Sequence, residues 1–123
     1  MIEPVAIDPD AYERDTLKSL GMPKQLPMRH RMPQFSHIFS GEGYAAGYYS
    51  YIWAEVLDSD AFEAFKERGL FDQATARSFR RNILERGGSD DAMAMWLRFR
   101  GREPSVEPLL ERRGLIPEKT AGN

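Results

Sequence analysis

The side chains best suited to chemistry lie in one stretch of the sequence, FSHIFSGEGYAAGYYSYIWAE, which runs from Phe35 to Glu55. It holds one of the two histidines of the chain, a glycine-rich turn and four of the five tyrosines. A phenol with a pKa of about 10 stays protonated at neutral pH and donates a hydrogen bond. A donor aimed at the oxyanion of an acyl-transfer transition state accelerates the reaction roughly 10²- to 10³-fold. The alternative interpretation is that the tyrosines pack in a helix interface with their hydroxyls at its wet edge.

The tyrosines follow a helical spacing. No proline occurs from Tyr44 until Pro104, and at about 100° per residue the helix would place Tyr44, Tyr48, Tyr51 and Glu55 on one face. A second face is apolar and a third carries small residues. The apolar residues are Ala45, Tyr49, Ile52, Trp53 and Val56, and the small ones are Gly47, Ser50 and Ala54. We expect the apolar face to be covered by stripes of the same chain that contain Phe62, Phe79 and Trp96.

A glycine-rich turn, Ser40–Gly43, separates the histidine from the first tyrosine. Gly41 and Gly43 lack the Cβ atom that would block the approach of another backbone. The turn therefore fits a mobile loop that closes over a bound chain, and it fits a turn that starts the helix. The two interpretations are compatible.

The two histidines do not predict a metal site. A catalytic zinc needs three protein ligands and an open position. His30 and His37 lie seven residues apart with Pro33 between them, so one helical face does not hold both. We expect His30, which stands in the run RHR, to be solvated or ion-paired.

The sequence pattern predicts that the other elements of the chain, which must hold this stretch in place, are also helices. Each expected helix starts at an acidic or hydroxyl residue or ends at a glycine, and strand patterns are absent. The expected helices span residues 10–20, 44–69, 72–87, 89–101 and 105–114, and residues 22–34, with three prolines, form an extended strap. Ser59 and Asp60 can either cap a new helix or continue the first, so residues 44–69 form one kinked helix or two. The class is therefore all-α, with about five helices packed as an irregular bundle. We expect a lead-in helix and strap (1–34), a helical body (35–119) and a disordered tail (120–123), in one structural domain overall.

The composition excludes several classes of partner. With 41% apolar residues, 29% charged residues and a net charge of −2, the chain reads as an ordinary globular domain that binds neither nucleic acid nor membrane. There is no cysteine, no signal sequence and no run long enough to span a bilayer, so we expect a cytoplasmic protein. Four arginines between residues 77 and 86 fit an anion site or a solvated face with paired acids.

The sequence resembles the C-terminal region of the thimet oligopeptidase and peptidyl-dipeptidase family of zinc metallopeptidases. The similar residues run from about Asp10 through RHRMPQFSHIF, GYAAGYYSYIWAEVLDSDAFEAF, GGSDD, FRGREPS and LLERRGL, which is nearly the whole chain. This family hydrolyses short peptides with a zinc-bound water, and its metal site is a helical H-E-x-x-H motif with a further glutamate. That motif does not occur in this sequence. The resemblance implies zinc in the full-length family and none bound to this chain.

The resemblance also implies roles for individual residues. Tyr48 and Tyr51 correspond to tyrosines that stabilise the transition state. The residues implied for substrate binding are His37, Gly41, Gly43 and Tyr44.

Two functions remain open at the level of the sequence. The chain is expected to be the C-terminal portion of a zinc metallopeptidase, which supplies histidine and tyrosine side chains to short peptide substrates but not the zinc, and which is inactive alone. The alternative is a free-standing, non-catalytic helical module that binds peptide or its own copy as a homodimer.

Overall fold

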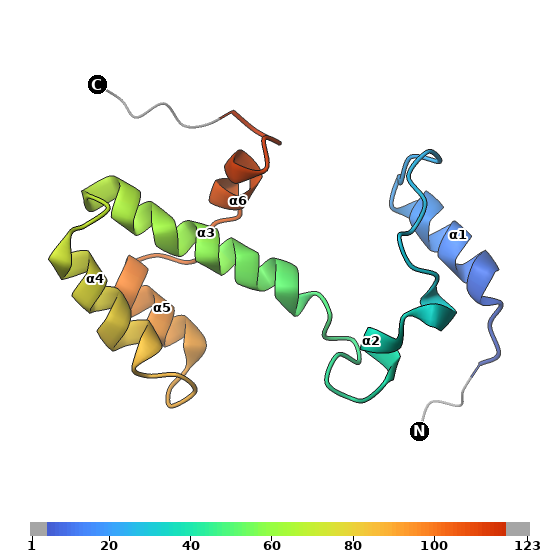
Figure 1. Cartoon of the computed structure of the whole chain (residues 1–123), viewed down its shortest axis with the longest axis horizontal. Helices are drawn as coiled ribbons and strands as arrows, with labels where there is room; N and C mark the ends of the chain where they lie inside the picture. The colour runs from blue at the N-terminus through green and yellow to red at the C-terminus, as the bar shows by residue number, and fades with distance from the viewer. Residues whose placement is uncertain (1–4, 118–123) are drawn as a thin grey trace. The chain divides into compact units, whose positions relative to one another are not determined.

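A computed structural model describes residues 5–117, and the described part of the chain is helical with no strand (Figure 1). This confirms the predicted all-α class. The chain divides into two compact units, and the boundary falls between Tyr48 and Tyr49. The expected boundary at residue 34 lies inside the first of these units, and the single structural domain stays a prediction. The expected tail at 120–123 lies outside the described residues.

The first unit begins with helix α1, Pro9–Ser19. The Asp8 carboxylate accepts hydrogen bonds from the backbone N–H groups of Asp10 (2.9 Å) and Ala11 (3.3 Å) and so caps the helix. Gly21 follows the helix at φ 71°, a conformation that glycine adopts without strain. The sequence predicted both ends of this helix.

The strap follows α1 and is held to it by ion pairs. Residues 22–31 form no helix, and Arg31 pairs with Asp10 and lies 3.9 Å from a carboxylate oxygen of Glu13. The prediction of an extended strap is wrong for its last residues, because Met32–Gln34 forms the 3₁₀ turn η1. Proline is tolerated there because the first turn of a helix does not need its N–H. Helix α2, Ser36–Phe39, follows directly.

The second unit is built around the longest helix. It contains α3 (Ser50–Arg68), α4 (Gln73–Phe79), the π-helical turn η2 (Arg80–Leu84), α5 (Ala92–Arg100) and α6 (Glu107–Arg112). Helix α3 contacts both α4 and α6, and η2 contacts α5. Figure 1 shows α4 and η2 folding back beside α5 as a helical hairpin. As predicted, Asp72 caps α4 by accepting from Thr75 N (2.7 Å). The predicted start of α5 at Ser89 is wrong, because the cap is Asp91, which accepts from Ala94 N (2.8 Å).

The predicted start of the central helix is wrong. Helix α3 begins at Ser50, and residues 43–49 form turns. Ala46 has φ 52°, in the left-handed region, and a right-handed helix cannot pass through that conformation. Tyr44 and Tyr48 therefore lie outside the helix and share no helical face with Tyr51. At its other end α3 continues without interruption to Gly69, so the region after residue 58 is part of one helix.

The core of the second unit lies along the middle of α3. Ala61 and Ala64 are buried with Trp96 and Phe99 of α5, and the partly buried Leu57, Phe65, Phe79 and Ile83 surround them. The large rings of α5 thus pack against small residues of α3. The expected cover over the start of α3 is absent: the exposed fractions of Tyr49, Ile52 and Trp53 are 69%, 51% and 45%, whereas Val56 is buried.

Candidate functional site

Three of the predicted site residues meet in the first unit. The ring centroids of His37 and Tyr44 are 4.8 Å apart, and the Tyr48 ring lies 5.7 Å from each of them. Tyr48 stands edge-on to both rings, which is a favourable arrangement of aromatic quadrupoles. Phe35 extends the group, since its ring lies 5.1 Å from Tyr48 and 5.1 Å from His30. We call His30, Phe35, His37, Tyr44 and Tyr48 the aromatic cluster.

The cluster is built from residues that are close in sequence, and its two tyrosines flank the left-handed residue Ala46. His37 is on α2, and the turn between Tyr44 and Tyr48 is closed by a hydrogen bond from Gly47 N to Tyr44 O (3.0 Å). A left-handed alanine costs about 1 kcal/mol or more. The sequence could not reveal this conformation, because alanine is normally a strong helix former.

The other predicted site residues are placed differently. Tyr51 is in the second unit, in the first turn of α3, where 48% of it is exposed. Gly41 and Gly43 precede the first tyrosine, and a Cβ atom added to either would meet no atom within 4 Å. The structure therefore leaves open space around both glycines, and their role in substrate binding stays a prediction.

The aromatic cluster offers hydrogen-bonding groups on rings that hold one another in place. A phenol both donates and accepts a hydrogen bond, and a neutral imidazole has one donor and one acceptor nitrogen. Such groups can bind the backbone of a peptide or an oxyanion. Within residues 5–117 no group of three or more His, Cys, Asp or Glu side chains could hold a metal ion. The described part of the chain therefore does not fit the zinc site of the family, and the absence of zinc from this chain stays a prediction.

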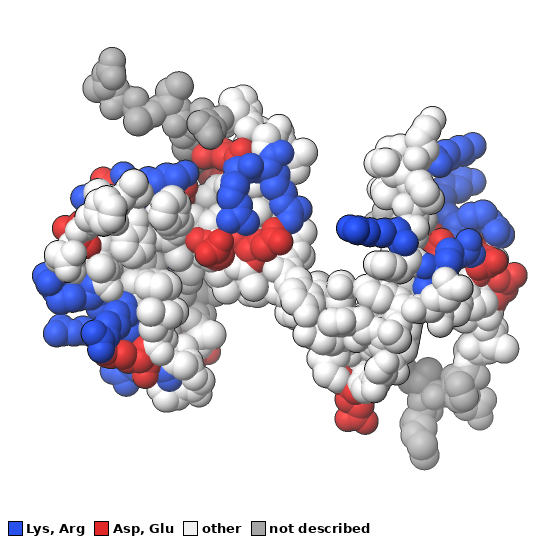
Figure 2. All heavy atoms as spheres, in the orientation of Figure 1, with Lys and Arg blue, Asp and Glu red and all other residues white. Residues whose placement is uncertain are grey.

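Two further predictions concern surfaces. None of the described helices is both long and apolar enough to cross a membrane. Figure 2 shows Lys and Arg side chains gathered around α4 and η2 with acidic side chains among them. Of the four arginines between residues 77 and 86, Arg80 pairs with Glu85 at 2.7 Å, and both side chains are exposed. This pair favours a solvated face with paired acids over an anion site.

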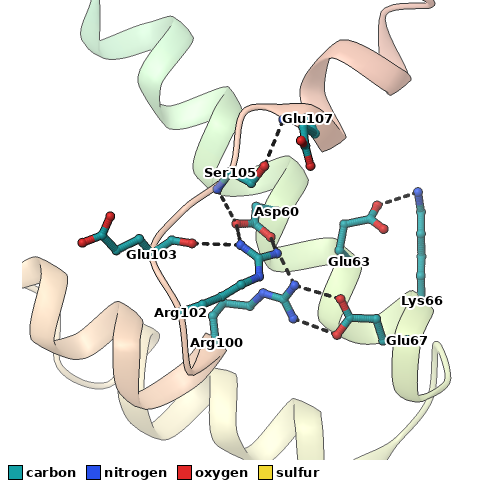
Figure 3. Close-up of polar contacts among 9 residues, drawn as sticks. All are labelled: Asp60, Glu63, Lys66, Glu67, Arg100, Arg102, Glu103, Ser105 and Glu107. Atoms are coloured by element: carbon teal, nitrogen blue, oxygen red, sulfur yellow. Dashed lines mark hydrogen bonds and ion pairs between the residues drawn. The ribbon is translucent and has the colours of Figure 1, made fainter. Parts of the chain in front are cut away.

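The sequence analysis missed a buried charge network at Asp60. The Asp60 side chain is fully buried on α3 and accepts hydrogen bonds from Arg100 (3.2 Å), from both terminal nitrogens of Arg102 (2.7 Å for Nη1), and from Ser105 N (2.8 Å). Arg100 also forms a bidentate pair with Glu67, at 2.9 and 3.0 Å. Figure 3 shows the two guanidinium groups converging on Asp60, that of Arg100 from the last residue of α5 and that of Arg102 from the segment that follows.

The network keeps its carboxylates ionised. Burial of Asp60 opposes its ionisation, but the hydrogen bonds from Arg102 and Ser105 and the charges of Arg102 and Arg100 outweigh burial and lower its pKa. The hydrogen bonds from Arg100 lower the pKa of Glu67 as well. One sequence signal could have indicated this network: Asp60 lies at helical spacing between the apolar residues Val56 and Ala64, and the motif FRGREPS supplies two arginines close together.

With the geometry described, comparisons with known proteins identify the class. The model of peptidase family M3 matches residues 7–115, and the chain belongs to this family. It is 56% identical over 90 residues to oligopeptidase A of Escherichia coli, which covers 72% of this chain and 13% of that protein. It is 49% identical over 106 residues to oligopeptidase A of Haemophilus influenzae (83% of this chain, 15% of that protein). It is 39% identical over 110 residues to dipeptidyl carboxypeptidase of Escherichia coli (88% and 16%). The chain thus spans about one seventh of the length of these curated relatives.

Proposed function

We propose that this chain contributes to the hydrolysis of short peptides as the C-terminal portion of a family M3 metallopeptidase. The observation that carries the proposal is the aromatic cluster, in which the rings of His37, Tyr44 and Tyr48 meet inside the region that the family model matches. The names of the relatives, oligopeptidase A and dipeptidyl carboxypeptidase, support peptides as substrates.

Each predicted residue has a role in this proposal. His37 and Tyr44 bind the peptide backbone by hydrogen bonds, and Gly41 and Gly43 leave room for it. Tyr48 and Tyr51 donate hydrogen bonds to the oxyanion that forms when the peptide carbonyl is attacked. The described residues supply no metal ligand set, so no step is assigned to zinc on this chain.

A hybrid peptidase tests the proposal. In this hybrid the chain replaces the matching part of Escherichia coli oligopeptidase A, and hydrolysis of a quenched fluorescent peptide is measured. Tyr48→Phe and Tyr51→Phe should each lower kcat on the order of 10²-fold with little change in KM, because the lost donors act mainly in the transition state. Tyr49→Phe is the matched control, since Tyr49 is an exposed neighbour with no assigned role.

Two results would contradict the proposal. A change in KM alone would show that the tyrosines bind substrate without stabilising the transition state. Unchanged kinetics in both variants, at wild-type levels of folded hybrid, would remove the tyrosines from catalysis.

A second candidate function has its own observation. The start of α3 exposes Tyr49, Ile52 and Trp53, and contiguous exposed apolar residues usually mark an interaction surface. We propose as the alternative that the chain acts as a self-associating helical module.

A further inference from the structure

The acidic side chains of α3 pair with arginines from the end of the chain. The pairs are Glu55–Arg113, Asp58–Arg112 (3.0 Å), Asp60–Arg100 (3.2 Å), Asp60–Arg102 and Glu67–Arg100 (2.9 Å). All the arginines lie between residues 100 and 113, and all the acids lie on one helix. We call residues 100–113 the arginine segment. It is fixed to α3 from Glu55 to Glu67.

These pairs differ greatly in burial. The Asp60 side chain is fully buried and the Arg100 side chain is 2% exposed, whereas both partners of Glu55–Arg113 are 44% exposed. Exposed ion pairs contribute little because water and salt screen them, but a buried carboxylate needs its partners in place. Asp60 is therefore the main attachment point between α3 and the arginine segment.

The arginine segment is itself held rigidly at this point. Arg102 Nη1 donates to Glu103 O (2.9 Å) as well as to Asp60 Oδ2, and Ser105 N donates to the same oxygen of Asp60 (2.8 Å). Ser105 then accepts from Glu107 N (3.2 Å), at the start of α6 (Figure 3). Helix α6 returns to α3 and buries Leu109.

Tyr51 is carried by the helix that Asp60 fixes. Helix α3 runs without a break from Ser50 to Arg68, and no glycine or proline lies between Tyr51 and Asp60. An uninterrupted helix of this length moves as a rigid rod, so the axial rotation and tilt of α3 at Asp60 also set the direction of the Tyr51 phenol, roughly 14 Å along the axis. A misplacement of about 1 Å at a reacting group can lower a rate on the order of 10²-fold.

We propose that Asp60 is a positioning residue, which acts through α3 to orient Tyr51 for catalysis. This inference rests on the proposed function, in which Tyr51 donates to the oxyanion. Asp60 does not touch substrate. It anchors α3 to the arginine segment, and it thereby gives the FRGREPS motif a role in catalysis.

A double-mutant cycle in the hybrid peptidase separates positioning from general stability. Asp60→Asn keeps the size of the side chain and removes its charge, and it should lower kcat on the order of tenfold with KM nearly unchanged. In the Tyr51→Phe background the same change should lower kcat by less than about twofold, because the phenol that Asp60 orients is already absent. Glu63→Gln is the control, because Glu63 is on the same helix but pairs with Lys66 of α3 itself (2.7 Å).

A second variant keeps the test decisive if Asp60→Asn does not fold. Arg102→Gln removes only the partly exposed partner of Asp60 and leaves the pair with Arg100. It should show the same dependence on Tyr51, with circular dichroism and the melting temperature reporting that the hybrid is folded.

The possible outcomes distinguish the two proposals. Suppose that Tyr51→Phe lowers kcat, but that Asp60→Asn or Arg102→Gln lowers kcat by the same factor whether or not Tyr51 is present. Asp60 is then only structural, and the positioning role is overturned. If Tyr51→Phe leaves kcat unchanged, both the positioning role and the proposed role of Tyr51 are overturned. Loss of the Asp60 effect in the Tyr51→Phe background supports the positioning role.

Discussion

At the scale of single residues, Asp60 shows how burial changes what a carboxylate does. An exposed aspartate on a helix contributes little to stability, but Asp60 is fully buried and is surrounded by the guanidinium groups of Arg100 and Arg102. Removing one partner of a buried pair leaves the other charge poorly compensated. If Asp60 is removed, Arg100 still pairs with Glu67. This pair lowers the cost of leaving Arg100 without Asp60, but it does not replace Asp60.

The lowered pKa of Asp60 predicts a specific dependence of stability on pH. A carboxyl whose pKa is lower in the folded state stabilises the fold fully above its unfolded pKa of about 4, and the contribution is lost as the pH falls through the folded pKa. Asp60→Asn should therefore lower the free energy of unfolding on the order of 3 kcal/mol at neutral pH. The difference from wild type should shrink below about pH 4.

Urea unfolding followed by tryptophan fluorescence measures this difference across the pH range. Asp58→Asn is the control, because Asp58 is 73% exposed and pairs with Arg112 only at the surface, so little change is expected. A difference between Asp60→Asn and wild type that stayed constant from neutral to acid pH would show that the charge of Asp60 is not what stabilises the fold.

At the scale of elements, the start of α3 separates what local sequence predicts from what it does not. Helix caps and stops depend on residues within one turn, so the cap at Asp72 and the stop at Gly69 were predictable, and Asp8 was one of two expected caps of α1. The cap of α5 was expected at Ser89 and lies two residues later, at Asp91. The spacing of the tyrosines indicated a helix from Tyr44, but the backbone turns left-handed at Ala46. The sequence therefore predicted three members of the aromatic cluster, His37, Tyr44 and Tyr48, but not the turn that connects the two tyrosines.

The Asp60 network escaped prediction for a different reason. Its partners are 40, 42 and 45 residues away, and hydrophobic periodicity carries no information on contacts at such separations. The sequence therefore indicated that residues 59 and 60 either cap or continue a helix, and the structure shows that they continue it.

Amide hydrogen exchange should reveal the start of α3. The first backbone hydrogen bond of the helix is Trp53 N to Tyr49 O (3.1 Å), so protection should begin at Trp53. The amides of residues 45–49, in exposed turns, should exchange at least about tenfold faster. Met95, in α5, serves as the protected reference. Protection that begins at Tyr48 would show that the helix extends to Tyr44 in solution.

At the scale of the whole molecule, the family membership of the chain and the exposed start of α3 both indicate a surface that contacts a partner. The chain spans about one seventh of the length of its curated relatives, and its second unit exposes Tyr49, Ile52 and Trp53 at the start of α3. The core covers only the middle of α3. The first buried residue of this helix is Val56. Apolar residues in such a group usually contact a partner.

For the isolated chain we propose a second copy as this partner. A patch that is complementary to itself most simply forms a two-fold dimer. Sedimentation at micromolar concentration should show a dimer, and Trp53→Glu should dissociate it. Phe71→Glu is the matched control, because Phe71 is an aromatic residue that is 89% exposed outside this patch. A monomeric wild-type chain, or a dimer that resists Trp53→Glu, would contradict the proposed surface.

The pairing of Asp60 with the arginine segment also orders the events of biosynthesis. The ribosome completes α3 well before it adds Arg100, Arg102 and Ser105, which follow Asp60 by 40 to 45 residues. During that interval the nascent helix carries a carboxylate that only water can satisfy, so α3 cannot yet bury this face. Long-range contacts of this kind slow folding, since a large loop must close before they form. The contacts of Asp60 therefore form only after residues 100–105 have left the ribosome.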